Sequence, residues 1–511
     1  MNRKLRWWPA GLIVGVAVAV AVWIRLRADW SFQERNLGTL STALGALVLL
    51  LLWWLILSGA NWRARLALTA VVLGSFGTVL TLFRIRGVSG DLRPILELRW
   101  GRPRVSKAQN PASANLPGFA MAQRFDFPQF LGPDRNAQLN APALGRDWDK
   151  TPPLILWRHP IGSGWSGWAI VGECAFTQEQ RPEGECSTCY EISTGRQVWS
   201  HTEAAHYENV LAGEGPRCTP TVASNRVFTL GPTGLLNCLD LRTGKRLWSH
   251  NLVEDAQSRI PEWGFAGSPL VYDGKVIVSG GGQGDRSLLA YSIEKGDLLW
   301  HAGSRPASYG SPSLATLSGV RQILAFNSHH ITSHDTASGE VLWEYPWGKG
   351  EPQAAAPVLV ATNQVLFSSG YGIGTELLQI EKGADGGLTA SRVWLSRKMK
   401  AKFANLIQRE GFLYGLDDGI LACIDLKDGT QRWKGGRYGH GQGLLIRDLF
   451  LLMAEDGELI LLRPTPEGPN ELHRFRVFNA KTWNPIALAG DLLLVRNDQE
   501  AACVHMPLEA K

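Results

Sequence analysis

A string of eleven residues recurs along the last two thirds of the chain, and its spacing limits the possible folds more than any other feature. It reads CLDLRTGKRLW at 238–248. Similar strings are CYEISTGRQVW (189–199), AYSIEKGDLLW (290–300), SHDTASGEVLW (333–343) and CIDLKDGTQRW (423–433). With a looser copy that ends at Trp394 and a solitary Trp157, the closing tryptophans are 39 to 52 residues apart. The chain is therefore built from structural repeats.

A second marker lies early in each unit and counts the units independently. It is a small or neutral polar residue, often followed by proline, as in RCTPTV, AGSPLV and YGSPSL. Its eight positions are Gly167, Thr219, Ser268, Ser311, Ala356, Asn405, Gln442 and Asn484. The chain from about residue 150 onward therefore contains eight units.

Each unit contains short alternating or apolar runs between polar turns, such as SNRVFTL and DGKVIVSG, which are typical of β-strands. Units of about 40 to 50 residues with about four strands each predict an all-β, eight-bladed β-propeller. Closing the ring protects sheet edges that an open array would expose. The strand LILWRH (154–159) has no blade of its own, and the last unit has no final Trp strand. We therefore predict that 154–159 pairs with residues near 500–507.

The recurring string is explained by structure alone. Asp240 can accept hydrogen bonds from the backbone amides of the turn that follows it. Gly244 can adopt the positive φ of a bulged hairpin turn. Trp248 can bury its ring against the neighbouring blade. A catalytic residue is needed once rather than once in each unit, so we interpret the string as a structural contact between blades.

Three apolar runs open the chain, at residues 7–24, 40–57 and 66–83. Each is about 18 residues long, close to the length of a transmembrane helix. A cleaved signal peptide is the alternative for the first run, but the two further runs favour a membrane anchor of three helices. We therefore divide the chain into a membrane anchor (1–87), a linker and leader (88–150), the propeller (151–507) and a short tail (508–511).

A basic stretch follows the third run and accounts for part of the net charge of +6. No aromatic residues alternate with its arginines as they would on a surface that stacks nucleobases. We expect it to lie near lipid headgroups and expect no nucleic-acid partner. Its residues are Arg84, Arg86, Arg93, Arg99, Arg102, Arg104 and Lys107.

The propeller resembles the family of eight-bladed propellers with pyrroloquinoline-quinone (PQQ)-type repeats. The pattern A-x-D-x-x-T-G-x-x-x-W, the tryptophan-docking motif, is matched well at 238–248 and 423–433. FPQFLGPDRNAQ (127–138) is similar to the leader that precedes such propellers in bacterial proteins. The family includes quinone-dependent dehydrogenases and non-catalytic scaffolds, one of them a lipoprotein that helps to assemble outer-membrane proteins.

The resemblance implies a propeller in the periplasm, attached to the inner membrane. The flanking charges give conflicting predictions. Counted over all three runs, the positive-inside rule places the propeller in the cytoplasm. The first helix alone has three basic residues on each side, and the N-terminal amino group then directs the propeller outward.

The residues favour a scaffold over an enzyme. The family's dehydrogenases hold a quinone with three carboxylates beside a calcium ion and carry adjacent cysteines, and this sequence has no such cysteine pair. The markers are only 37 to 52 residues apart, which leaves little room for pocket-building insertions. We predict a membrane-tethered, non-catalytic binding or assembly scaffold with a protein or envelope partner and no cofactor. The alternative is a PQQ- and calcium-dependent alcohol or sugar dehydrogenase that passes electrons to the membrane.

Basic residues two or three positions before the markers suggest a binding site at the mouth of the central channel. We predict that this mouth is weakly basic and holds a carboxylate or an acidic peptide segment. Alternatively, these side chains cap strand ends or reach solvent. The candidate residues are Arg217, Lys402 and His440, with the markers Asn405, Gln442 and Asn484.

Two other groups could bind metal, but their patterns argue against it. CSTC (186–189) is half of a zinc motif without a second half, so a local disulfide or buried thiols are the simpler interpretations of the cysteines. The seven cysteines are an odd number, so at least one is unpaired within the chain. In SHHITSH, strand alternation directs His329 and His330 to opposite faces.

Overall fold

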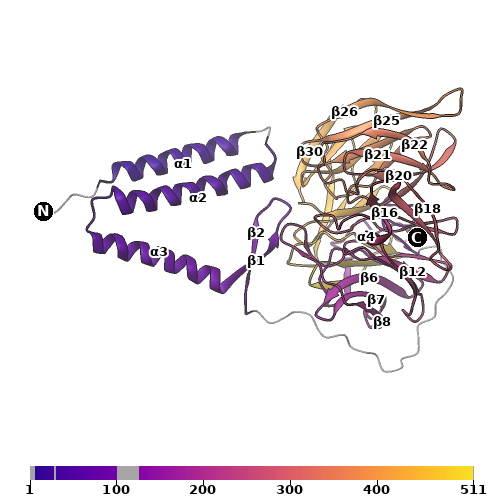
Figure 1. Cartoon of the computed structure of the whole chain (residues 1–511), viewed down its shortest axis with the longest axis horizontal. Coiled ribbons are helices and arrows are strands. Elements are labelled where there is room, and N and C mark those ends of the chain that lie inside the picture. Colours follow the sequence, from indigo (N-terminus) through magenta and orange to yellow (C-terminus); the bar gives the residue numbers. More distant parts are fainter. Residues whose placement is uncertain (1–5, 28–29, 101–125, 510–511) are drawn as a thin grey trace. The chain divides into compact units, whose positions relative to one another are not determined.

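The computed structural model describes residues 6–27, 30–100 and 126–509. The chain forms two compact units, an N-terminal helical unit and the propeller, and each is described by itself (Figure 1).

The N-terminal unit contains three helices, each long and apolar enough to cross a membrane. They are α1 (Trp8–Leu26), α2 (Phe32–Ile56) and α3 (Trp62–Leu82). The three apolar runs are thus confirmed as helices. Helix α2 begins eight residues before the predicted run because Ser31 and Glu34 form a capping box at its start.

A two-stranded hairpin, β1 (Phe83–Val88) and β2 (Pro94–Leu98), follows α3 directly. Its turn is bonded to the start of α2. The side chains of Gln33 and Asn36 donate to the carbonyl oxygens of Gly90 and Asp91, at 2.6 and 2.9 Å. The segment after the third helix is therefore anchored to the helical unit.

The propeller has eight antiparallel blades of four strands each, as predicted, and blade 7 carries one further short parallel strand at its inner edge. In blades 1 to 7 the strands follow chain order from the channel outward. Blade 1 is β5 (Ala169–Val171), β6 (Cys174–Arg181), β7 (Gly184–Glu191) and β8 (Gln197–Glu203); blade 2 is β11 (Thr221–Ala223), β12 (Arg226–Leu230), β13 (Leu235–Asp240) and β14 (Arg246–Asn251); blade 3 is β15 (Leu270–Tyr272), β16 (Lys275–Gly282), β17 (Arg286–Ser292) and β18 (Leu298–Ala302); blade 4 is β19 (Ser313–Leu317), β20 (Val320–Phe326), β21 (His330–Asp335) and β22 (Val341–Pro346).

The second half of the ring repeats this order. Blade 5 is β23 (Val358–Ala361), β24 (Gln364–Ser369), β25 (Gly374–Lys382) and β26 (Leu388–Ser396); blade 6 is β27 (Ile407–Arg409), β28 (Phe412–Asp417), β29 (Ile420–Asp425) and β30 (Gln431–Arg437); blade 7 is β31 (Gln442–Ile446), β32 (Leu449–Met453), β33 (Glu458–Leu462) and β34 (Glu471–Arg476); blade 8 is β35 (Ala487–Ala489), β36 (Leu492–Arg496), β37 (Glu500–His505) and β4 (Leu154–Pro160). Short additional elements are β3 (Gln138–Leu139), β9 (Glu208–Asn209), β10 (Gly213–Glu214) and α4 (Leu252–Asp255).

The ring closes as the sequence predicted. Strand β4 pairs antiparallel with β37, so that blade 8 takes strands from both ends of the domain. Glu500 pairs with Pro160, and Cys503 with Trp157. The solitary Trp157 is thus the outer-strand tryptophan of blade 8.

The recurring string forms contacts between neighbouring blades. Asp240 accepts hydrogen bonds from the backbone N–H groups of Arg242 and Thr243. Gly244 has a φ of +68°, and a Cβ at this position would overlap the ring of Trp199 from the preceding blade. The indole of Trp199 donates to the carbonyl oxygen of Leu241 at 3.1 Å. The glycine therefore provides both the turn conformation and the space for a neighbouring indole.

The two faces of the propeller differ in the connections they carry. We call the face where the inner strands begin the upper face, and the face with the turns between first and second strands the lower face. The markers precede the inner strands and so lie toward the upper face. The turns of the recurring string lie on the lower face, where Leu241 N–H donates to Asn225 in the turn between β11 and β12.

The leader (residues 126–148) crosses the lower face. Phe127 exchanges two backbone hydrogen bonds with Ile170 of blade 1, at 2.9 and 2.7 Å. Strand β3 pairs in parallel with β31 of blade 7, and Gln138 donates to Gln408 of blade 6. Blade 2 lies opposite blade 6 in the ring, and Pro128 also accepts from Val222 of blade 2. The leader therefore spans the lower end of the central channel.

Arg135 is inserted from the leader into this channel. Its guanidinium donates to the carbonyl oxygens of Ser268 and Pro269 in blade 3, at 3.2 and 3.0 Å. The residue is only 8% exposed, and burial lowers its pKa to about 10. A buried charge is thus stabilised mainly by backbone carbonyls.

Candidate functional site

The first four markers bind neighbouring blades to one another. The backbone N–H of Gly167 donates to the hydroxyl of Thr219 at 3.2 Å, and that of Thr219 to the hydroxyl of Ser268 at 2.9 Å. The N–H of Ser268 donates in turn to the hydroxyl of Ser311 at 2.9 Å. Each small polar side chain therefore satisfies a backbone donor of the blade before it.

The amide markers Asn405, Gln442 and Asn484 make contacts of the same kind. The carbonyl oxygen of the Gln442 side chain accepts from the backbone N–H of Asn405 at 3.3 Å, so the structure brings these two residues together. Asn405 exchanges hydrogen bonds with the backbone of Gly443, and Asn484 donates to the carbonyl oxygen of Ser166 at 2.8 Å. All three are 5% exposed or less. They hold the inner strands together, and a ligand-binding role for them remains a prediction.

Arg217 lies in the segment that leads into blade 2. It donates to the carbonyl oxygen of Gly215, and its guanidinium lies 4.7 Å from the ring centre of Tyr207. Burial lowers the pKa of Arg217 to about 10.

Lys402 and His440 precede blades 6 and 7, and both are buried. The Lys402 ammonium lies 3.7 Å from the carboxylate of Asp418 and 5.7 Å from the ring centre of Tyr371. The backbone N–H of His440 donates to Glu455 at 2.9 Å. The predicted basic residues are therefore distributed around the upper face, and each lies close to an aromatic ring.

Aromatic side chains from several blades meet at the upper face in two groups. The tryptophan cluster consists of Trp165, Phe403, His440 and Trp483. Trp483 lies 5.0 Å from Trp165 and 5.1 Å from Phe403, and Phe403 lies 5.7 Å from His440, measured between ring centres. Phe403 precedes blade 6 and Trp483 precedes blade 8, so these rings extend past blade 7. Lys481 lies over both tryptophans, 4.5 Å from Trp165 and 3.9 Å from Trp483.

The tyrosine cluster consists of Tyr207, Trp263, Tyr309 and Tyr371. Trp263 stacks on Tyr309 at 5.1 Å and lies 6.4 Å from Tyr371, although Tyr371 belongs to blade 5. Tyr371 is 37% exposed, and Trp263, Phe403 and Trp483 are half-buried. Together with the cations, these rings form a partly exposed aromatic and basic surface. We call it the upper-face surface.

The sequence analysis did not predict the aromatic part of this surface. A signal was present, because Trp165, Tyr309, Phe403 and Trp483 each stand one or two residues before a marker. An aromatic residue before an inner strand could also pack inside its own blade, and only the structure shows rings from distant blades in contact.

Blade 1 carries a buried polar network on the side that faces blade 8. Glu179 is fully buried and accepts from Arg181 and Tyr190, both at 2.8 Å. Arg496 of blade 8 donates to Thr177 at 2.8 Å and to the carbonyl oxygen of Gly162 at 2.7 Å. Burial alone would raise the pKa of Glu179, but the charges of Arg181 and Arg496 lower it overall. The network is therefore ionised and links the two blades that close the ring.

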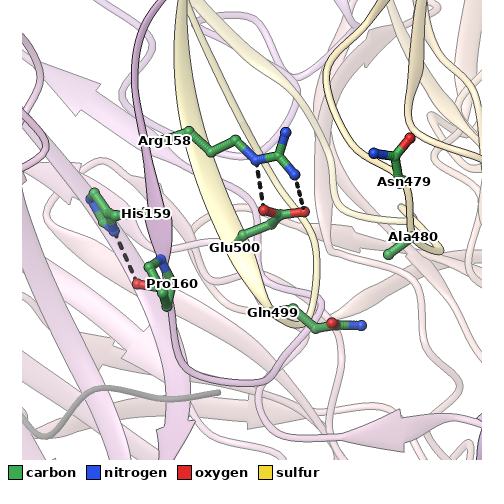
Figure 2. Close-up of a pocket in the computed structure, with 7 residues that line it drawn as sticks. All are labelled: Arg158, His159, Pro160, Asn479, Ala480, Gln499 and Glu500. Carbon is green, nitrogen blue, oxygen red and sulfur yellow. Dashed lines mark hydrogen bonds and ion pairs between the residues drawn. The ribbon is translucent and has the colours of Figure 1, made fainter. Parts of the chain in front are cut away.

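The seam where the ring closes also contains a cavity of about 550 Å³ (Figure 2). Figure 2 shows the guanidinium of Arg158 facing the carboxylate of Glu500, with N···O distances of 2.6 and 2.9 Å. Asn479 and Gln499 line the same cavity. The charges of Arg158 and Glu500 satisfy each other, so this cavity offers a polar recess rather than a charged site.

The cysteines are buried free thiols in this structure. His334 is fully buried, with its ring nitrogens 2.8 Å from the carbonyl oxygen of Gly339 and 2.9 Å from the hydroxyl of Thr332. Within the described residues, one group of metal-type ligands lies close together: Asp147, Asp149 and His473, at the periphery of blade 7 and away from the upper-face surface.

Comparisons with known proteins agree with this architecture. Residues 183–435 match the family model described as outer membrane protein assembly factor BamB. No curated protein sequence matches the chain.

Among solved structures, BamB from Moraxella catarrhalis is similar, with a TM-score of 0.51 and 15% identity over 70% of this chain and 99% of that chain. The quinohemoprotein alcohol dehydrogenase from Comamonas testosteroni has a TM-score of 0.55 and 13% identity over 76% of this chain and 82% of that chain. The quinohemoprotein alcohol dehydrogenase ADHIIG from Pseudomonas putida HK5 has a TM-score of 0.54 and 13% identity over 76% and 81%. Identities this low establish the fold alone.

The fold and its seams thus define an eight-bladed β-propeller assembled from repeated interblade contacts. More specifically, its repeats are of the PQQ type, since residues 183–435 match that family model, and the propeller is joined here to three helices of membrane-spanning length.

Proposed function

We propose that this chain is a membrane-tethered, non-catalytic binding scaffold of the bacterial cell envelope. The three helices anchor it in the inner membrane, and the propeller lies in the periplasm. It binds a protein or envelope ligand at the upper-face surface. The observation that carries the proposal is the gathering of half-buried aromatic rings with Arg217, Lys402 and Lys481 at one end of a channel whose other end the leader spans.

The chemistry of this surface favours a ligand with carboxylates. Aromatic and basic side chains that are partly exposed provide most of the binding energy in many protein interfaces. The indole N–H groups of Trp165, Trp263 and Trp483 have no acceptor among the described residues. A surface rich in cations and in N–H donors is complementary to a carboxylate or to an acidic peptide segment.

The same residues do not fit a quinone beside a calcium ion. Calcium requires several oxygen ligands around one point. Two carboxylates near the upper face, those of Asp417 and Asp418, already lie beside positive charges. Asp417 binds Lys400 and Lys434, at 2.6 and 2.5 Å, and Asp418 lies between Lys400 and Lys402. This supports binding rather than redox chemistry as the function.

Site-specific photocrosslinking of the full-length protein in intact cells tests the proposal. A photoreactive residue in place of Phe403 should give a discrete crosslinked partner. The same residue in place of Leu299, which is 49% exposed on the outer strand β18, should not. Crosslinks of equal strength at both positions would contradict a ligand site at the upper face.

Charge substitutions then test the predicted residues. Replacing Arg217 and Lys402 by Met and His440 by Asn should weaken the Phe403 crosslink. Because Lys402 and His440 are buried, the melting temperature must be measured in parallel. Lys481→Gln, at a more accessible position, should weaken the crosslink without loss of stability. An unchanged crosslink in both variants would contradict a role for these basic residues in ligand binding.

Two further measurements address the alternatives. Dye-linked oxidation of alcohols or sugars by the full-length protein with added quinone and calcium would overturn the non-catalytic assignment. A protease-protection assay on intact cells and spheroplasts determines the side of the membrane, and a propeller protected in spheroplasts would contradict the periplasmic assignment.

A further inference from the structure

Glu185 is a buried carboxyl group whose hydrogen-bonding capacity is not satisfied. It lies at the upper end of β7, on the side of blade 1 that faces blade 2, and is 6% exposed. Its Oε1 atom is buried and accepts no hydrogen bond from the part of the chain that the structure describes. Its Oε2 atom contacts Gly231 in the turn between β12 and β13, where a Cβ would overlap it. An unsatisfied buried acceptor is costly, so a charged carboxylate is disfavoured here.

The other polar side chains on this side of blade 1 are satisfied. Gln178 donates to the carbonyl oxygen of Cys218 at 2.8 Å, and Gln180 donates to Glu214 at 2.8 Å. Ser187 donates to Thr229 of blade 2 at 3.1 Å. Glu185 therefore stands out within an otherwise complete set of hydrogen bonds.

Charged groups approach Glu185 from three sides. Arg217 comes from the segment before β11, and Glu214 is held by Gln180. Glu203 lies opposite on β8 and pairs with His201 and with Arg246 of blade 2, both at 2.8 Å. The turn of blade 2 nearest to Glu185, at Gly231, is uncharged, and the nearby Cys218 thiol is neutral because burial raises its pKa. Burial and, more weakly, Glu203 raise the pKa of Glu185 to about 7, while Arg217 opposes this shift.

The pKa values of Arg217 and Glu185 do not shift in the directions expected for the two partners of a salt bridge. A salt bridge lowers the pKa of its acid and raises that of its base. Here burial raises the pKa of the acid and lowers that of Arg217 to about 10. The two groups are thus close enough to interact, while neither compensates fully for the burial of the other.

We propose that Glu185 is a proton-binding site that controls the affinity of Arg217 for a carboxylate ligand at the upper face. When Glu185 is protonated, the positive charge of Arg217 is available to the ligand. When Glu185 is ionised, its negative charge offsets that of Arg217 and repels the ligand. This inference rests on the proposed function, because it assumes that Arg217 contributes to the upper-face surface.

Linkage gives the direction of the effect. A ligand that binds better to the protonated form must increase the proton affinity of Glu185. Carboxylate binding should therefore strengthen as the pH falls through about 7. Protons would be taken up on binding at neutral pH.

The first test concerns the proton site alone and needs no ligand. Unfolding of the full-length protein in detergent is followed by denaturant titration between pH 5 and 8.5. Because the folded-state pKa of Glu185 is raised, its contribution to stability is full below the unfolded pKa and is lost as the pH rises toward 7. Glu185→Gln should abolish this part of the pH dependence. Glu183→Gln, an exposed position in the same hairpin, should retain it. An identical pH dependence in wild type and Glu185→Gln would overturn the proposal.

The second test measures coupling to a carboxylate probe. Binding of a fluorescein-labelled hexaglutamate peptide is measured by anisotropy at pH 6 and pH 8.5. The wild type should bind about tenfold more tightly at pH 6, which corresponds to one pKa unit of coupling. Glu185→Gln should bind equally at both pH values, and Arg217→Met weakly at both. A tenfold difference that persists in Glu185→Gln would contradict control by Glu185. If the peptide binds the wild type at neither pH, the upper-face function is contradicted, while the first test still decides the proton site.

Discussion

Blades 1 and 7 have the same four-stranded topology but different interiors. The three inner strands of blade 7 read QGLLI, LFLLM and ELILL, and nearly every residue in them is buried. Strand β6 of blade 1 reads CAFTQEQR and is also buried throughout. One blade is thus held by close apolar packing, the other by specific hydrogen bonds and ion pairs.

The difference shows which features the fold requires. Both blades accept, at a backbone carbonyl oxygen, a hydrogen bond from the outer-strand tryptophan of the preceding blade. Trp157 of blade 8 donates to Ile192 of blade 1, and Trp433 of blade 6 donates to Thr465 of blade 7. Because the seam contact is common to both, the interior can vary. A polar interior costs free energy unless every group is paired, so blade 1 is where a function other than folding is expected.

The largest expected effect is the loss of the buried charge network of blade 1. Glu179→Gln keeps the shape of the side chain but leaves Arg181 and Arg496 without their carboxylate. Breaking a buried ion pair typically costs about 3–5 kcal/mol, so we expect a loss of about 4 kcal/mol in the free energy of unfolding at pH 7. Denaturant titration measures this loss, with Glu183→Gln as the exposed control. A loss below about 1 kcal/mol would show that the network is dispensable.

The apolar counterpart in blade 7 is Leu461→Ala. Leu461 is fully buried, and truncation in a packed core costs about 3 kcal/mol. The two variants should differ in their pH dependence. The lowered pKa of Glu179 means that its contribution is present above the unfolded pKa and is lost as the pH falls through the folded pKa. The deficit of Glu179→Gln should therefore shrink in acid, while that of Leu461→Ala should not. If the stability losses of the two variants had the same pH dependence, the proposed difference between a polar and an apolar blade interior would be contradicted.

A glycine substitution tests the contact between a hairpin glycine and the tryptophan of the preceding blade, which recurs around the ring. Gly244→Ala adds a methyl group against Trp199 at a positive φ, and we expect a loss of about 2 kcal/mol. Gly274 has a similar φ of +69° but open space around its Cβ position, so Gly274→Ala should cost about 1 kcal/mol. The difference between the two melting curves isolates the contact with the indole. Equal losses would mean that only the turn conformation matters.

The smallest effect is expected at the exposed edge of the closing seam. Arg158→Ala removes the pair with Glu500, whose arginine side chain is 36% exposed. Exposed ion pairs contribute about 0.5 kcal/mol, and this contribution should decrease further at high salt. A loss of several kcal/mol in thermal unfolding would indicate that this pair, rather than strand pairing, holds the ring closed.

The architecture could be predicted because its determinants are local and repeated. Trp157 and the incomplete last unit sufficed to predict the pairing of β4 with β37. The role of the markers was harder to predict. A small polar residue before an inner strand could either line a water-filled channel or form a hydrogen bond to the next blade. In the structure Ser268 and Asn405 make the second kind of contact.

Long-range contacts account for what the sequence did not indicate. The motif FPQFLGPDRNAQ could be recognised as a leader, but its path across the channel depends on partners more than 130 residues away, such as Ser268 for Arg135. The unsatisfied state of Glu185 depends likewise on Gly231 in the next blade. A single sequence gives no indication of which side chains such partners will enclose.

The path of the leader has a mechanical consequence. In the chain, the leader comes between the three apolar helices, which are long enough to cross a membrane, and β4, the strand that closes the ring. A pull along the chain from the membrane would first load the hydrogen bonds of Phe127, Pro128 and Gln138. These bonds distribute the force over inner strands on both sides of the ring. Tension applied from the N-terminal side would therefore reach the pairing of β4 with β37 only after the leader had detached from the propeller.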